Sequence, residues 1–132
     1  MAARMAQPSV SLAVVVPLRT GTGLNAREHW AARSRRVRSE RDLVAFHLRY
    51  YAGACPPLVR AASAVRVRLV RLGGRRCDGD NLAGGLKAVR DEVARWLGKD
   101  DGDPSVSWSY SAEPGGPWGV RVEVTTGEEL SR

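Results

Sequence analysis

Acidic residues gather in one short segment of an otherwise basic chain. Residues 78–103 read DGDNLAGGLKAVRDEVARWLGKDDGD and hold seven of the fourteen Asp and Glu residues, whereas residues 60–76 hold six arginines and no acid. Carboxylate oxygens are the ligands that Mg²⁺ and Mn²⁺ prefer, and arginine binds phosphate groups. The pattern therefore indicates a metal site facing a polyanion, with nucleic acid as the polyanion and phosphodiester hydrolysis as the reaction.

The first acidic group is a pair of aspartates at the start of an expected helix. Asp78 and Asp80 are two residues apart, a spacing that puts both carboxylates on one side of an extended segment. Aspartates at a helix N-terminus are equally typical of simple caps. Four residues share one face of the helix at spacings of four, three and four: Asp80, Gly84, Lys87 and Asp91. The gap at Gly84 leaves room for an ion or a phosphate oxygen, while Lys87 and Asp91 also read as a surface ion pair worth about 0.3–0.5 kcal/mol.

The second acidic group follows Gly98, where residues 99–103 read KDDGD. Taken alone, this is a polar turn. If the fold brings it beside Asp78 and Asp80, one or two of its aspartates complete an all-oxygen site for Mg²⁺ or Mn²⁺. An EF-hand is excluded because the position eleven after Asp78 is Val89 rather than glutamate.

Other chemistries find little support. His29 and His47 form no credible Ser-His-Asp or Cys-His arrangement, and Cys55 and Cys77 form no CxxC pair, so we expect a reducing, cytoplasmic setting and no small-molecule cofactor. The net charge of +7 and the pI of about 10.4 favour phosphate-rich partners. The apolar run 10–18 is too short to span a bilayer, so no membrane association is expected.

The elements that must position these residues are read from the hydrophobic pattern. Strands are predicted from period-two alternation, helices from apolar stripes, and turns from Gly and Pro. The predicted segments are strand 9–17, helix 26–51 capped by Asn25 with Glu28, strand 64–72, helix 80–97, and two strands around 106–110 and 120–124 joined by a hairpin turn at 113–118. The order β-α-β-α-β-β predicts an α+β fold: a single domain over residues 1–132, with one mixed sheet, two helices, and loose tails at 1–8 and 127–132.

Side-chain orientation follows from the same pattern. The first helix is expected to bury a stripe of apolar residues: Trp30, Val37, Val44, Leu48 and Tyr51. In strand 64–72, Val65, Val67 and Leu69 are expected to face the core, and Arg66 and Arg68 the solvent. The aromatic residues expected in the core rather than on a base-stacking surface are Trp30, Trp96, Trp108 and Tyr110.

The acidic segment and its surroundings resemble the RusA family of Holliday junction resolvases. That family has an Arg-rich strand end, an Asp-x-Asp-Asn-Leu sequence, a helix carrying Lys and Asp, and an Asp-Asp pair before the next strand. The matching residues are Arg75, Arg76, Asp78, Asp80, Asn81, Leu82, Lys87, Asp91, Asp100 and Asp101. The N-terminal Asn25, Arg27 and Trp30 also resemble phage-type members.

The resemblance implies a homodimeric, Mg²⁺-dependent endonuclease that nicks four-way DNA junctions symmetrically, with Mn²⁺ as a substitute metal. It implies that Asp78, Asp80 and Asp101 are metal ligands, that Asp100 is an auxiliary acid, and that Lys87 contacts the scissile phosphate. Branched DNA is then the partner, and the arginines expected to contact its backbone are Arg27, Arg33, Arg35, Arg36, Arg75 and Arg76.

The chain departs from the family pattern at the lysine. In well-known members the lysine follows the second aspartate by four residues, where this chain has Gly84, and Lys87 comes three residues later. Three residues rotate a helix by about 300° and advance it by about 4.5 Å. Either the loop absorbs the insertion or Lys87 plays a different part, and the choice between Asp101 and Asp103 stays open. The alternatives are a DNA-binding protein without catalysis and a Mg²⁺ nuclease acting on other branched DNA.

Overall fold

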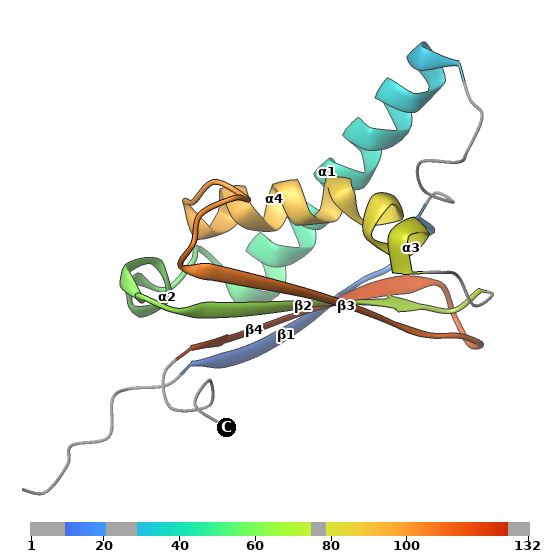
Figure 1. The fold of residues 1–132 in the computed structure, drawn as a ribbon. Coiled ribbons are helices and arrows are strands. Elements are labelled where there is room, and N and C mark those ends of the chain that lie inside the picture. Colours follow the sequence, from blue (N-terminus) through green and yellow to red (C-terminus); the bar gives the residue numbers. More distant parts are fainter. Residues whose placement is uncertain (1–9, 21–28, 75–78, 127–132) are drawn as a thin grey trace, which may run out of the picture.

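The fold is a four-stranded sheet with helices packed on one of its faces (Figure 1). The computed structural model describes residues 10–20, 29–74 and 79–126, except for the side chains of residues 79–81. The elements are β1 (Ser11–Val16), α1 (Trp30–Ala52), α2 (Pro57–Ala61), β2 (Val65–Leu72), α3 (Gly79–Gly85), α4 (Lys87–Leu97), β3 (Val106–Glu113) and β4 (Gly119–Thr126). The predicted α+β class and single mixed sheet are confirmed. The described residues form four helices rather than the expected two.

The strand order is β1-β4-β2-β3, with β2 parallel to β3 and antiparallel to β4. The predicted hairpin at 113–118 is wrong, because β2 lies between the two strands that this segment connects. The connection crosses close to the end of β2, where Gly73 and Gly74 have φ of +78° and +74°. A Cβ on Gly73 would lie 2.8 Å from the Pro117 carbonyl oxygen, so the crossing requires glycine.

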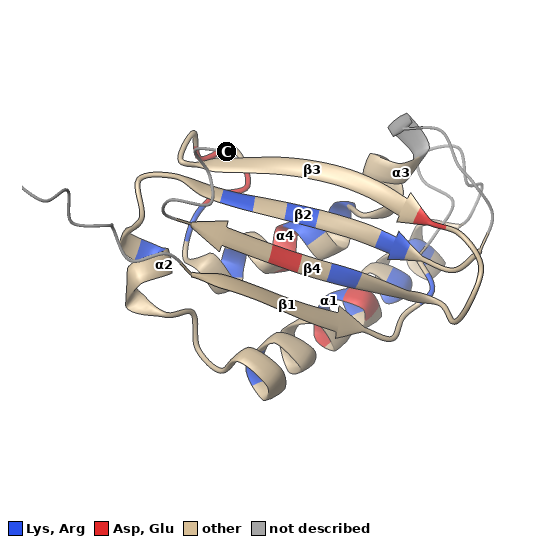
Figure 2. Cartoon of the chain, turned by 90° about the horizontal axis from the view of Figure 1, so that it is seen from below, with Lys and Arg blue, Asp and Glu red and all other residues tan. Residues whose placement is uncertain are grey.

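The hydrophobic core lies between the sheet and the helices. Val65, Val67 and Leu69 of β2 are buried, whereas Arg66 and Arg68 are exposed, as the alternating sequence predicts. Figure 2 looks onto the opposite face of the sheet, which the described helices leave uncovered and which carries charged residues on β2 and β4. There Glu123 accepts hydrogen bonds from Arg68 at 3.5 Å and from Arg121 at 2.7 Å.

Helix α1 begins later than the sequence predicts. Its first residue is Trp30, and the His29 ring accepts a 3.2 Å hydrogen bond from the Ala31 N–H as the cap. The expected cap, Asn25 with Glu28, lies outside the described residues.

The predicted apolar stripe of α1 is only half correct. Val44 and Leu48 are fully buried, but Trp30 and Tyr51 are 74% and 66% exposed. The N-terminal half of α1 extends beyond the sheet (Figure 1), so Trp30 has no described core to pack against.

The predicted helix 80–97 is divided into α3 and α4 at Leu86, whose φ of −101° and ψ of 8° lie outside the helical range. Gly84 and Gly85 weaken the helix at this point by about 1 kcal/mol each relative to alanine. Leu86 is fully buried and belongs to the hydrophobic core. Gly98 ends α4 with a φ of +72°, as expected of a C-terminal glycine.

Candidate functional site

Helix α3 holds the start of the acidic segment at the end of the sheet where β2 ends (Figure 1). Leu82 is 7% exposed and Leu86 fully buried, so both leucines anchor this helix to the core. The backbone of Asp80 lies in α3, and its side chain is outside the described set. Four other predicted site residues lie outside the described residues: Arg27, Arg75, Arg76 and Asp78.

A hollow of about 220 Å³ lies beside the α3–α4 break. Its lining is Arg33, Arg36, Val37, Glu40, Gly84, Gly85, Lys87, Ala88 and Asp91. Gly84 thus borders open space, in line with the gap inferred from the sequence. Lys87 and Asp91 form the expected ion pair at 3.2 Å, and Arg36 contacts Glu40 at 3.3 Å. The third predicted arginine of this helix, Arg35, is exposed.

The two acidic groups lie at opposite ends of α4. Strands β2 and β3 are parallel, with Val65 opposite Val106, so the turn that precedes β3 sits where β2 begins. Helix α3 instead follows the other end of β2, and the 11 residues of α4 between them span about 16 Å. One protomer therefore does not bring the α3 backbone at Asp80 together with Asp100, Asp101 or Asp103.

Arg90 holds the turn that contains Asp101. Its guanidinium donates 2.8 Å hydrogen bonds to the Asp101 carbonyl and the Tyr110 hydroxyl, and it lies 4.7 Å from the centre of the Trp108 ring. The Asp101 carboxylate lies 3.6 Å from Arg90 Nε and is half exposed, while Asp100 is exposed beside it. Asp101 is thus partly neutralised by an arginine in this conformation.

Asp103 has a structural role in the same turn. Its carboxylate accepts hydrogen bonds from the Ser105 N–H at 2.8 Å and the Ser105 hydroxyl at 2.7 Å. These contacts, the hydroxyl first, lower the pKa of Asp103. Lys99 extends the network by donating to Ser105 Oγ at 2.7 Å and to the Ala62 carbonyl at 3.1 Å. Asp103 therefore stabilises the turn, which favours Asp101 over Asp103 as a candidate ligand.

Among the side chains that the structure describes, no three His, Cys, Asp or Glu residues come together as a metal-holding group. Asp78 and the side chain of Asp80 are not among the described residues. Within the described ranges, no helix is both long enough and apolar enough to cross a membrane.

A large groove between α1 and α4 brings Arg33, which the sequence predicts to contact DNA, together with five further arginines. Its volume is about 870 Å³, and it reaches Gly53, Cys55 and Trp96 at one end. Six arginines line it: Arg33, Arg38, Arg41, Arg49, Arg60 and Arg95. Four of its α1 residues recur at spacings of four, three and four, a helical periodicity that the sequence already contains: Arg38, Asp42, Ala45 and Arg49.

Comparison with known proteins gives no family for the chain: no protein-family model matches it, and no curated protein matches it. The assignment of function therefore rests on the residues of this chain.

Proposed function

We propose that this protein is a Mg²⁺-dependent endonuclease that resolves four-way DNA junctions by paired nicks, acting as a homodimer. The observation that carries the proposal is the hollow beside Gly84 and Gly85. It borders the helix that carries Asp80, and three cationic side chains line it: Arg33, Arg36 and Lys87. The lining also holds Glu40 and Asp91, and the net positive charge that remains beside a carboxylate-bearing helix suits a phosphodiester held beside a divalent metal.

The donor chemistry fits Mg²⁺, because Asp78, Asp80 and Asp101 supply only hard carboxylate oxygens. When bound, the metal would supply a water of lowered pKa and stabilisation of the leaving oxygen. Helix α4 separates Asp80 from Asp101 within one protomer. A site that uses both groups therefore takes Asp101 from a second copy of the chain, with Asp100 beside it.

The described residues around the hollow have roles of their own. The Lys87 side chain is 68% exposed and 3.2 Å from Asp91, so its ammonium is held yet accessible to a phosphate oxygen. Arg33 and Arg36 approach the hollow from α1 and position the DNA backbone without reading its sequence. A four-way junction requires two matched cuts, and a two-fold dimer supplies two equivalent sites.

A nicking assay on a labelled synthetic four-way junction tests the proposal, with Mg²⁺ and with EDTA. We expect the wild type to nick only with Mg²⁺, and Asp80→Asn to lose cleavage while keeping junction affinity. Glu123→Gln is the matched control, since Glu123 lies opposite the exposed Arg68 in the sheet and therefore on its outer face. Equal cleavage by Asp80→Asn and the wild type would refute the proposed metal site.

The same assay separates the alternatives. Junction binding without nicking under either condition would support a DNA-binding protein without catalysis. Faster nicking of labelled flaps or simple duplexes than of the four-way junction would support a nuclease for other DNA. Both outcomes would contradict junction resolution as the function.

A further inference from the structure

The groove between α1 and α4 has an excess of positive charge on walls that are held in place. Only two acids line it with the six arginines, Asp42 and Glu92. Glu92 is already paired, because its carboxylate lies 3.3 Å from Arg41 Nε and joins the two helices. Arg60 is also held, by a 3.3 Å hydrogen bond to the Trp96 carbonyl.

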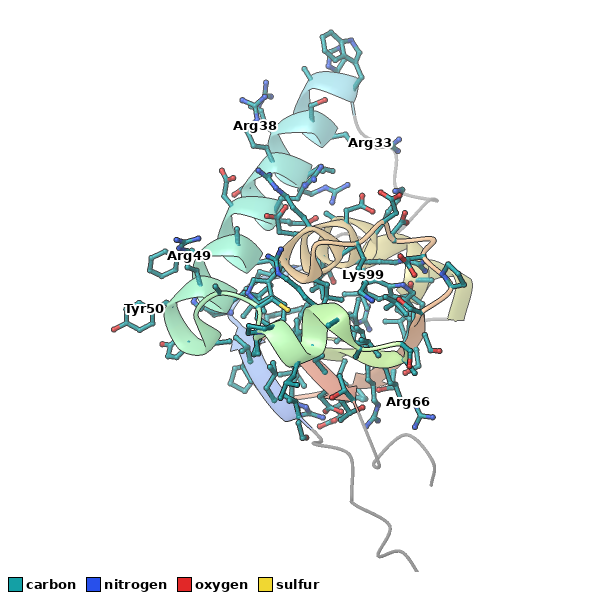
Figure 3. The ribbon with its side chains drawn as sticks, turned by 90° about the vertical axis from the view of Figure 1, so that its left-hand side faces the viewer. Arg33, Arg38, Arg49, Tyr50, Arg66 and Lys99 are labelled. Carbon is teal, nitrogen blue, oxygen red and sulfur yellow. The ribbon has the colours of Figure 1, made fainter. Side chains whose placement is uncertain are left out.

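Three of the groove arginines are exposed and have no ion-pair partner among the described residues: Arg38, Arg49 and Arg95. Arg38 and Arg49 come from α1, and Arg95 comes from α4 on the opposite wall. Figure 3 shows Arg33, Arg38 and Arg49 spaced along α1, with Arg66 far from them at the sheet side of the molecule. The cations that remain available to a ligand therefore lie on both sides of the groove.

The distance between Arg38 and Arg49 along α1 favours an extended polyanion over a small anion as the ligand. Arg38 and Arg49 are eleven residues apart on one helix, a distance of about 16 Å. One strand of duplex DNA carries a phosphate for about every 3.4 Å of its axis, so several phosphates fit along this distance. A single small anion would reach only one or two of these side chains.

The shape of the surface favours a strand over a membrane. The arginines line a concave groove, into which a flat lipid surface does not enter. Trp96 lines the same groove, and its Nε1 donates a 2.9 Å hydrogen bond to the Gly53 carbonyl. The guanidinium groups are suited to the phosphates of a nucleic-acid backbone, and the fixed Trp96 ring is suited to its sugars.

We propose that the groove between α1 and α4 binds the phosphate backbone of nucleic acid, as an extension of the hollow at Gly84 with which it shares Arg33. The proposal takes its class of partner from the proposed function, but it does not require the protein to cut that partner. The arginines that carry it are Arg38, Arg49 and Arg95, and Arg95 lies outside the segments whose arginines the sequence predicts to contact DNA.

Binding of a fluorescently labelled DNA duplex in EDTA, measured by anisotropy over a series of salt concentrations, tests the groove apart from catalysis. The variants are Arg49→Gln, Arg95→Gln and their combination. Arg66→Gln is the matched control, because Arg66 is equally exposed, has no ion-pair partner among described residues, and points away from the groove. Circular dichroism and thermal melting check that each variant is folded.

We expect the slope of log K against log salt to fall by about 0.9 for each groove arginine removed, and the double variant to bind at least about tenfold more weakly at 0.1 M salt. Arg66→Gln should bind as the wild type does, apart from a small general charge effect. Wild-type affinity in the double variant, or an equal loss in Arg66→Gln, would overturn the proposal. Binding to vesicles of anionic lipid but not to the duplex would also overturn it, in favour of a membrane partner.

A measurement on the wild type does not depend on variants that fold. Phenylglyoxal modifies accessible arginines, and mass spectrometry of the digested protein locates them. Saturating duplex should protect Arg49 and Arg95 and leave Arg66 reactive; equal reactivity of all three with and without duplex would refute the groove as the site. If the protein binds DNA through the groove but never nicks a junction, the proposed function fails and this inference stands.

Discussion

The guanidinium of Arg90 lies over the Trp108 ring, 4.7 Å from its centre, and so joins α4 to β3. The same group donates 2.8 Å hydrogen bonds to the Tyr110 hydroxyl and the Asp101 carbonyl. Trp108 Nε1 also donates a 2.9 Å hydrogen bond to the Asp101 carbonyl. Arg90 and Trp108 together therefore set where the acidic turn lies relative to the sheet.

Replacing Arg90 with Met should lower the free energy of unfolding by about 2 kcal/mol, because two hydrogen bonds and the stacking on Trp108 are lost while the side-chain length is kept. Urea unfolding followed by circular dichroism measures the change. Tyr110→Phe is the control, with an expected loss of about 1 kcal/mol from one hydrogen bond. An Arg90→Met variant as stable as the wild type would contradict the assigned role.

The substitution Lys87→Gln tests whether Lys87 acts on the scissile phosphate or only forms a surface ion pair with Asp91. The pair with Asp91 is exposed, so breaking it should change stability by about 0.3–0.5 kcal/mol. If Lys87 stabilises the charge that develops on the scissile phosphate, junction cleavage should fall about 100-fold with little change in affinity.

Asp91→Asn is the control for Lys87, because it breaks the same pair and keeps the ammonium group. It should keep most of the cleavage activity in the same Mg²⁺-dependent assay. An identical loss in the two variants would mean that the pair itself, and not the lysine charge, matters.

Gly73→Ala should lower the free energy of unfolding by about 2 kcal/mol, since alanine is strained at the φ of +78° and its Cβ would meet the Pro117 carbonyl. Gly102→Ala offers a matched comparison, because that position has an ordinary φ and open space around the new Cβ. Its effect should stay within about 0.5 kcal/mol. Chemical denaturation of both variants would show the difference, and equal stabilities would contradict the close crossing at Gly73.

The turn at Asp103 should weaken in acid. The Ser105 hydroxyl and N–H lower the pKa of Asp103 in the folded state. The stabilisation is therefore complete above the ordinary pKa of aspartate and is lost as the pH falls through the lowered value. Melting temperatures measured against pH should converge for the wild type and Asp103→Asn at low pH and separate towards neutral pH. Parallel curves over the whole range would exclude this linkage.

The elements with a strong local pattern were predictable from the sequence. Strand β2 begins and ends within one residue of its prediction, because apolar residues and arginines alternate at the strand period. The apolar residues face the core, and Arg66 and Arg68 face the solvent. Gly98 marked the end of α4 because a left-handed C-terminal residue favours glycine. These features depend on neighbours in the chain.

Features that depend on distant parts of the chain were not predictable in this way. The segment 113–118 carries a turn signal, but whether its flanking strands pair depends on β2, which comes about forty residues earlier. Trp30 looked like the first residue of a core stripe, and only the geometry of the sheet leaves it exposed.

In the candidate site, too, local features were predictable from the sequence and the arrangement of distant segments was not. The residue types of the acidic segment indicated carboxylate chemistry, but their spacing could not place Asp80 relative to Asp101. The parallel pairing of β2 with β3 separates them, because a helix that joins parallel strands must run the length of the sheet. The groove itself was not predictable, because its arginines come from α1, α2 and α4 and only packing brings them together.

The pairing of β1 with β4 has a consequence for how the chain is made. In the described sheet, β1 has β4 as its single hydrogen-bonded neighbour, and Ser11 lies opposite Thr125. During translation, β1 therefore waits without this partner until β4, about one hundred residues later, has left the ribosome. Contacts between such distant segments also slow refolding. Closure of this sheet therefore requires residues 119–126, however early β1 is made.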